Sequence, residues 1–206
     1  MLDIREVSFR YDADAPLLRY MMQAGAGEIT AVTGESGSGK STLLDLIAGF
    51  LRPLSGEIVL EERRIDTLAP DKRGVAILFQ RHNLFEHLTV AQNLALARKG
   101  ISAEEIAAIL DEVGLQGLEK RRASELSGGQ AQRVALARTL LSDARAVLLD
   151  EPFSALDSKT KAEMLTLVET MTKRHRWHTV MVTHDEADAA LAARRYRMQE
   201  GVLREA

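Results

Sequence analysis

A glycine-rich segment that joins an apolar strand to a helix restricts the fold of this chain more than any other feature. The segment reads Gly34, Glu35, Ser36, Gly37, Ser38, Gly39, Lys40 and Ser41, followed by Thr42. An apolar run at 29–32 precedes it, and apolar residues at helical spacing follow it until Gly49. Glycines let backbone N–H groups curl around phosphate oxygens, and the N-terminus of the next helix adds positive potential. Strand, loop and helix in this order predict an α/β domain that binds a nucleotide.

The last two residues of the segment carry specific chemistry in such a site. Lys40 is expected to neutralise the β- and γ-phosphates, and the Ser41 hydroxyl is expected to be a ligand for Mg²⁺. The alternative is a glycine-rich turn that binds nothing. The strand before the loop and the helix after it argue against that alternative.

Two adjacent carboxylates, Asp150 and Glu151, extend the predicted site. They follow the apolar run at 146–149, which is typical of a strand buried in a parallel sheet. In enzymes with a phosphate loop, an Asp at the end of such a strand holds the Mg²⁺, and an adjacent Glu can act as general base on water. The alternative is a pair of acidic residues that only end the strand before Pro152.

A second helix start, at Leu126 to Gln130, is also suited to a phosphate. Ser127 and Gln130 have the spacing of a capping box, and Gly128 and Gly129 lie directly inside it. Glycines in a first helical turn cost roughly 1 kcal/mol each relative to alanine, so a close approach by a ligand is indicated, with a flexible cap as the alternative. One compact domain can hardly enclose a nucleotide from both sides. We therefore predict a homodimer that closes around the nucleotide.

Length and composition are consistent with one globular domain over residues 1–206. The apolar fraction of 46% is ordinary, and the net charge of −3 gives no basic field, so we expect no nucleic-acid partner. The absence of cysteine excludes disulfides and thiolate chemistry. No apolar run approaches the ~20 residues that cross a bilayer, so work at a membrane would need another subunit. A capping box at Ser102 and Glu105 begins the helical pattern of an insertion at about residues 85–140.

Taken in order, these motifs resemble those of the ATP-binding subunits of ABC transporters, over essentially the whole chain. The resemblance implies a P-loop NTPase (RecA-like) α/β core with an N-terminal antiparallel β subdomain and an inserted helical subdomain. It implies ATP hydrolysis with Mg²⁺ as cofactor. The corresponding segments are the Walker A loop at Gly34 to Ser41, the Q-loop at Gln80, the signature motif at Leu126 to Gln130, Walker B at Val147 to Glu151, the D-loop at Ser154 to Asp157, and the switch histidine at His184.

The resemblance also implies roles for single residues. Tyr11 would stack on adenine, unless it is a strand aromatic in the core. Gln80 would contact Mg²⁺ and water together with Ser41 and Asp150, and His184 would contact the γ-phosphate and keep Glu151 in line. The partner subunit would supply Ser127, Gly128, Gly129, Gln130 and Asp157, although Asp157 is by pattern also a good helix N-cap. Glu35 departs from the family, which often has proline there, and we expect it to point outward.

Within this family, the segment 79–93 and the segment 148–157 resemble those of bacterial thiamine-importer ATPases. The implied partners are transmembrane permease subunits and, indirectly, a periplasmic substrate-binding protein, with this chain peripheral at the cytoplasmic face of the inner membrane. A short ABC ATPase for another substrate, for lipoprotein release or for cell division is the alternative. The segment His82 to Val90 would form part of the permease docking groove, with Leu84, Phe85 and Leu88 as apolar anchors, or those side chains would pack internally.

Overall fold

In the computed structural model, which describes residues 1–80 and 84–206, ten strands form a single mixed sheet. The strand order is β5-β4-β1-β2-β10-β9-β3-β8-β7-β6. The strands are β1 (Leu2–Phe9), β2 (Leu18–Ala24), β3 (Glu28–Gly34), β4 (Ser55–Leu60), β5 (Arg63–Arg64), β6 (Val75–Leu78), β7 (Ala146–Asp150), β8 (His178–Val182), β9 (Arg194–Gln199) and β10 (Val202–Glu205). The helices are α1 (Lys40–Ala48), α2 (Val90–Ala95), α3 (Ala103–Glu112), α4 (Gly128–Leu140), α5 (Ser158–His175) and α6 (Glu186–Ala189), with short 3₁₀ turns at Pro70–Lys72 and Ala123–Glu125.

The strands β9, β3, β8, β7 and β6 pair in parallel and form the part of the sheet that positions the site. Every residue of β7 and β8 is buried, as expected for strands that are covered on both faces. Since the strands run the same way, the loops that follow β3, β6, β7 and β8 all leave from one edge. In open α/β sheets, ligands bind outside this carboxyl edge.

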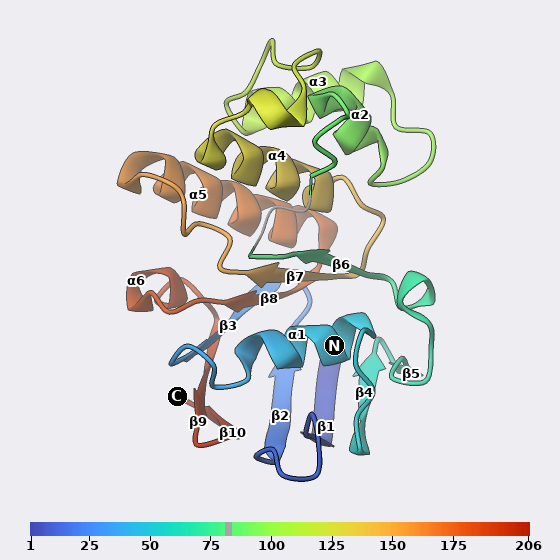
Figure 1. Ribbon diagram of the computed structural model, residues 1–206, viewed down its shortest axis with the longest axis vertical. Coiled ribbons are helices and arrows are strands. Elements are labelled where there is room, and N and C mark those ends of the chain that lie inside the picture. The colour runs from blue at the N-terminus through green and yellow to red at the C-terminus, as the bar shows by residue number, and fades with distance from the viewer. Residues whose placement is uncertain (81–83) are drawn as a thin grey trace.

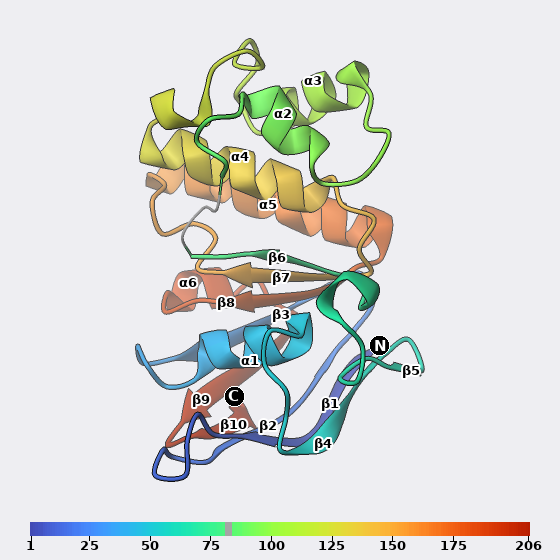
Figure 2. The same cartoon turned by 45° about the vertical axis from the view of Figure 1, so that its right-hand side comes forward.

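Helices cover the two faces of the parallel strands (Figure 1). Helix α1 lies between these strands and the antiparallel strands β1 and β2, and its buried side chains belong to one apolar core. Helices α4 and α5 cover the opposite face, with α2 and α3 packed beyond α4, and these four helices share a second core (Figure 2). In residues 1–80 and 84–206, no helix combines the length and apolarity that a bilayer span requires.

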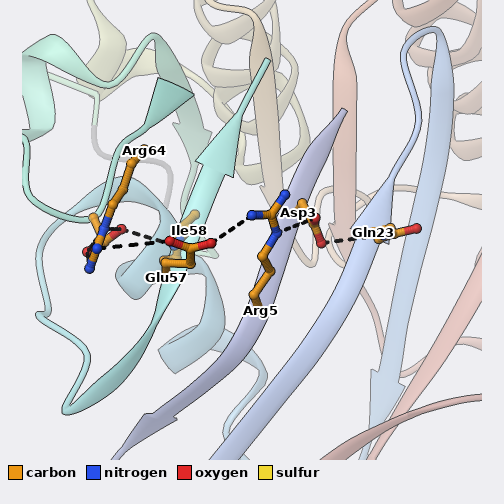
Figure 3. A network of polar contacts seen from close by, with 7 residues as sticks. Asp3, Arg5, Gln23, Glu57, Ile58 and Arg64 are labelled. Carbon is orange, nitrogen blue, oxygen red and sulfur yellow. Dashed lines mark hydrogen bonds and ion pairs between the residues drawn. The ribbon is translucent and has the colours of Figure 1, made fainter. Parts of the chain in front are cut away.

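The antiparallel strands β5, β4, β1 and β2 are linked by a row of polar side chains, which are charged except for Gln23 on β2 (Figure 3). Arg5 on β1 donates hydrogen bonds of 2.7 Å to Asp3 and to Glu57 on β4. Arg64 on β5 lies 3.9 Å from Glu57 and donates to Asp66, whose carboxylate also accepts the backbone N–H of Ile58 at 3.0 Å. Cross-strand pairs of opposite charge stabilise such sheets.

Most expected elements lie where the sequence predicts them. The capping boxes at Ser102 and at Ser127 are both formed, and they begin α3 and α4. The sequence near Glu200 and Gly201 predicts a terminal hairpin, and the chain turns there between β9 and β10. The segments 75–79 and 179–183 predict strands that end at Phe79 and Thr183, but both strands end one residue earlier, at Leu78 and Val182, where the loops of the carboxyl edge begin. Helices α2, α3 and α4 lie in the segment predicted as an insertion, whose boundaries at about 85 and 140 stay a prediction.

Candidate functional site

The carboxyl edge of the parallel strands brings together the loops that carry the expected site residues. The glycine-rich loop follows β3, and Gln80, Glu151 and His184 follow β6, β7 and β8. A cleft of about 890 Å³ lies at this edge. It is lined by Tyr11, by the whole loop from Glu35 to Thr42, and by Gln80 and Glu151. The residues predicted separately from four sequence segments therefore share one cleft.

The glycine-rich loop is folded around the ammonium group of Lys40. The Nζ atom donates to the carbonyl oxygens of Gly34 at 2.8 Å and Glu35 at 2.7 Å. Burial lowers the pKa of Lys40, while the carboxylates of Glu151 and Asp150 act in the opposite direction. The carbonyl contacts hold the ammonium group at the centre of the loop, where a ligand oxygen can replace them. The side chain of Glu35 is exposed, in agreement with the expected outward position.

Position 39 requires glycine for two reasons, its backbone conformation and the closeness of neighbouring side chains. Its φ of 109° belongs to the left-handed region that side chains disfavour. A Cβ atom there would lie 3.0 Å from the Tyr20 hydroxyl and 3.1 Å from a methyl group of Leu18. The loop can therefore enter helix α1 only with glycine at this position.

Of the three oxygen donors predicted to bind Mg²⁺, Ser41 and Gln80 line the cleft, and Asp150 is buried beside Ser41 at the end of β7. Burial raises the pKa of Asp150, and a hydrogen bond from Ser41 opposes that shift. Among the described residues, no three His, Cys, Asp or Glu side chains gather to hold a metal by themselves. Mg²⁺ commonly takes only one or two carboxylates and completes its shell with water and substrate phosphates. A hydroxyl, an amide oxygen and one carboxylate beside a phosphate loop fit that ion.

Glu151 is held between the other two residues predicted to be catalytic. Its Oε2 accepts a hydrogen bond from Gln80 Nε2 at 3.0 Å, and its Oε1 lies 3.2 Å from Nδ1 of His184. The second contact is a hydrogen bond when Nδ1 carries the proton. Glu151 has a φ of 47°, which costs a non-glycine residue of order 1–3 kcal/mol. Such strain is typical of functional turns, and here it directs the carboxylate into the cleft between two donors.

Tyr11 lies at the mouth of the cleft and outside the core. Tyr11 is 64% exposed. Its ring packs edge to face on Phe9 with 5.0 Å between the ring centroids, and its hydroxyl lies 2.9 Å from the hydroxyl of Thr42. The alternative of a core aromatic is therefore wrong. A ring fixed at both its edge and its hydroxyl can present a flat face to a planar ligand group.

The first turn of α4 is shaped as predicted and is open to solvent. Ser127 Oγ accepts the N–H of Gln130 at 3.3 Å, and the Gln130 side chain accepts the N–H of Ser127 at 3.0 Å. A Cβ atom on Gly128 would meet nothing within 4 Å, and one on Gly129 would make only ordinary contacts. Within the described part of the chain, this turn lies outside the residues that line the cleft. One copy of the chain therefore presents the two phosphate-suited features on separate surfaces.

Asp157 is the N-cap of α5, which confirms the interpretation from local pattern. Its carboxylate accepts the backbone N–H groups of Lys159 and Thr160, each at 3.1 Å, and the Thr160 hydroxyl at 2.7 Å. These contacts hold the turn that ends in Asp157 at the start of the helix. Its expected role across a dimer interface stays a prediction.

Gln132 is a site residue that the sequence reasoning missed. It is buried on α4, donates to the carbonyl oxygen of Glu151 at 3.3 Å and accepts the N–H of Ala155 at 3.1 Å. Gln132 therefore joins the turn that contains Glu151 to helix α4, whose N-cap is Ser127. The available signal was a glutamine just before the apolar positions Val134 and Ala135 of that helix.

The predicted docking segment divides between the two interpretations given for it. His82 and Asn83 lie outside the described residues. Leu84 is partly buried and packs against the helical core, whereas Phe85 is 49% exposed. Phe50 is exposed as well and pairs with Phe79 at 5.7 Å. Exposed aromatic side chains therefore remain within the segment, at Phe85, and next to Phe79, at Phe50.

Known proteins resemble this chain both in sequence and in structure. A family model described as ABC transporter matches residues 18–154. The thiamine import ATP-binding proteins ThiQ of Escherichia coli (strain K12) and of Shigella flexneri are each 44% identical over 201 residues, which is 95% of this chain and 86% of theirs. A dimeric ATP-binding cassette in a post-hydrolysis state, bound to ADP and Pi, superimposes with a TM-score of 0.89 at 29% identity, covering 100% of this chain and 98% of that one. A dimeric bacterial ABC transporter cassette gives 0.88 at 30% identity with the same coverage.

Proposed function

The chain belongs to the ABC transporter family of ATP-hydrolysing subunits, and we propose that it drives the import of thiamine or thiamine phosphates through a membrane permease. Binding and hydrolysis of ATP follow from the family. The observation that carries the proposed chemistry is the carboxylate of Glu151, held by Gln80 and His184 at the edge of the cleft. The proposed substrate depends on the 44% identity to thiamine import proteins over 95% of the chain.

The geometry supports a general-base role for Glu151. Each of its carboxylate oxygens has one neighbour that orients it, so a lone pair remains on each for the attacking water. Glu151 takes a proton from water as the water attacks the γ-phosphorus and the bond to the β-phosphate oxygen breaks. Lys40 neutralises the charge that develops on the phosphate oxygens. Ser41, Gln80 and Asp150 would hold Mg²⁺, which would supply further positive charge beside the β- and γ-phosphates.

We propose that the working form is a homodimer with two-fold symmetry. Ser127, Gly128, Gly129 and Gln130 of one protomer would then face the nucleotide held by its partner, and Asp157 would lie at the shared interface. Support comes from the exposed, unfilled turn at the start of α4, together with the dimeric state of the two similar cassettes. In an isologous interface the arrangement occurs twice, so two nucleotides are enclosed. ATP favours the closed dimer, and loss of the γ-phosphate favours opening.

The remaining partners follow from the proposed import role. Permease subunits would dock on the surface that carries Phe85, whose ring is about half exposed. A periplasmic binding protein would act indirectly, by delivering the ligand to the permease. The chain would then be a peripheral subunit at the cytoplasmic face of a bacterial inner membrane.

Co-purification tests this proposal most directly. A tagged chain with Glu151→Gln, which is expected to hold the closed state, is expressed in its own host and isolated from detergent-extracted membranes. The expected result is a permease in stoichiometric amount, whose complex with the unaltered chain hydrolyses ATP faster with a thiamine-loaded binding protein than with an empty one. A permease stimulated only by another ligand, or a partner that serves lipoprotein release or cell division, would contradict the import of thiamine.

A further inference from the structure

Behind Glu151 and His184 lies an ionic cluster that the proposed chemistry does not use. The ammonium group of Lys161 lies 2.5 Å from the carboxylate of Asp185 and 2.7 Å from that of Asp188. Lys161 belongs to the first turn of α5, whereas the two aspartates belong to the turn and short helix that follow β8. A single cation thus joins two segments that are 24 residues or more apart in the sequence.

The pair of Lys161 and Asp188 is largely shielded from water, whereas the side chain of Asp185 is 40% exposed. The side chain of Asp188 is only 7% exposed, and that of Lys161 is 23% exposed. Thr183 donates its hydroxyl hydrogen to Asp188 at 3.3 Å and accepts the N–H of Asp185 at 3.0 Å. Asp185 also caps α6 through the N–H of Ala187 at 2.8 Å. Shielded ion pairs of this kind resist screening by salt more than surface pairs do.

The cluster lies next to His184, which contacts Glu151 and whose own side chain is exposed. His184 stands between Thr183 and Asp185 in the sequence, so both of its neighbours take part in these contacts. A small polar cavity of about 210 Å³ is lined by members of the cluster together with Glu151 and His184. On the other side, the backbone N–H of Lys161 donates to the carbonyl oxygen of Asp157 at 2.8 Å.

We propose that Lys161 is a positioning residue, which fixes the loop of His184 against the start of α5 and thereby keeps the His184 ring on the carboxylate of Glu151. The inference rests on the proposed role of His184 in hydrolysis. It extends that role by naming the contact that keeps the imidazole in place. It also links His184 to the turn of Asp157, because Lys161 contacts both segments.

Charge explains why the loop depends on this one side chain. Without Lys161, the carboxylates of Asp185 and Asp188 would stand close together with no cation between them, and one of them is buried. Like charges at such range repel, and a buried carboxylate without a partner is strongly destabilised. The turn at 183–188 would open to hydrate these groups, and His184 would move with it. A displacement near 1 Å at a catalytic group is enough to lower turnover by up to about a hundredfold.

The test compares four variants of the full-length chain. Lys161→Met removes the cation, Lys161→Arg retains it, and Asp188→Asn breaks one contact while leaving a neutral group that can stay buried. Lys173→Met is the matched control, since Lys173 lies on the same helix and pairs with Glu169 at an exposed site. Steady-state ATP hydrolysis gives kcat and KM. The ring resonance of His184, assigned by its loss in His184→Gln, reports its environment among the five histidines of the chain.

The expected result is a kcat lowered about tenfold in Lys161→Met and lowered less in Asp188→Asn, which keeps the contact of Lys161 with Asp185, with the KM for ATP nearly unchanged. The His184 resonance should shift in both variants, Lys161→Arg should recover most of the turnover, and Lys173→Met should match the wild-type protein. An unmoved His184 resonance in Lys161→Met, or a fall in kcat that Lys161→Arg does not reverse, overturns the inference. Unchanged turnover in His184→Gln would contradict the proposed role of His184 instead, and the resonance would still decide whether Lys161 positions the ring.

Discussion

Gln80 donates a hydrogen bond of 3.0 Å to the carboxylate of Glu151, although 71 residues separate the two in the sequence. The register of the strands explains why Gln80 and Glu151 lie side by side. Leu78 pairs with Leu149 across β6 and β7, so that Gln80 and Glu151 each stand two residues beyond a paired position. On the other side of β7, the backbone N–H of Glu151 donates to the carbonyl oxygen of Val182 at 2.9 Å, which places His184 two residues further on. The catalytic arrangement is therefore a consequence of three adjacent parallel strands that end together.

Replacing Glu151 by Gln should abolish turnover while leaving ATP binding intact. The substitution keeps the size of the side chain and removes the base, a role that contributes roughly 10²–10⁴-fold to rate. A dimer should then accumulate in the presence of ATP, because the variant cannot hydrolyse ATP and so cannot open the closed form. Phosphate release and size-exclusion chromatography with light scattering measure the two effects, and Glu169→Gln on the exposed face of α5 is the control. A monomer with wild-type turnover would exclude the proposed role.

Lys40→Ala should weaken ATP binding without unfolding the chain. Within residues 1–80 and 84–206, the hydrogen bonds of the ammonium group go to the carbonyl oxygens of Gly34 and Glu35, to which a water molecule can donate instead. A charge-assisted hydrogen bond is worth about 1.5–3 kcal/mol, so the Kd for ATP should rise by at least about tenfold. Isothermal titration calorimetry measures the change, with Lys72→Ala at an exposed position as the control. If Lys40→Ala binds ATP with the affinity of the wild-type protein, the glycine-rich loop is not the phosphate-binding loop.

Motifs with a fixed backbone role could be predicted from the sequence, and contacts between distant segments could not. The glycine-rich loop, the capping box at Ser127 and the buried strand before Asp150 each depend on local spacing, and all three are present. Gln132 and Lys161 act through partners that only the folded sheet brings near, since each crosses from a helix to a loop of the carboxyl edge. No periodicity distinguishes such side chains from ordinary polar residues on a helix.

The position of Tyr11 is a case in which the sequence left two interpretations open. A strand aromatic before a loop reads equally well as core or as surface. The structure decides between them, because β1 ends at Phe9 and Tyr11 lies beyond it, beside Thr42 in the first turn of α1. The sequence could not show that the segment after β1 meets the start of α1.

Tyr11→Ala should raise the KM for ATP, whereas Tyr11→Phe should not. Both variants lose the contact of the hydroxyl with Thr42, but only Tyr11→Ala loses the exposed ring. Stacking between an aromatic side chain and a base is worth about 1–3 kcal/mol, which corresponds to roughly tenfold or more in KM. Comparing ATP with inorganic triphosphate as substrate locates the effect, since the triphosphate has no base to stack. Equal effects of Tyr11→Ala on both substrates would show that the ring does not bind adenine.

Asp66→Asn should make the free energy of unfolding less sensitive to acid. Burial by itself would raise the pKa of Asp66, but hydrogen bonds from Arg64 and from the N–H of Ile58 outweigh it and hold the pKa below its usual value. A carboxylate with a depressed pKa contributes stability above the pKa of the unfolded chain, near 4, and that contribution is lost as the pH falls further. The variant should lose about 1 kcal/mol at pH 7 and show a smaller decrease between pH 5 and pH 3. Urea unfolding at these pH values measures both, with Asp71→Asn as the exposed control.

The two glycines at the start of α4 allow stability and activity to be separated. A Cβ atom on Gly128 would meet nothing within 4 Å, and one on Gly129 would lie 3.4 Å from the carbonyl oxygen of Ala155, an ordinary contact. Within a single copy of the chain, alanine is therefore acceptable at both positions and should stabilise the nucleotide-free protein by about 0.4–1 kcal/mol through the unfolded state. If a partner's nucleotide approaches this turn, the same methyl groups should lower turnover and prevent the ATP-dependent dimer of Glu151→Gln. Each variant is tested by thermal unfolding without nucleotide, by its ATPase rate and by light scattering. The control is Ala131→Gly in the next turn, which should lose stability but retain activity. If the Gly129→Ala variant is both more stable and fully active, no nucleotide of a partner approaches this turn closely. That result would contradict the proposal of a nucleotide site shared by two protomers.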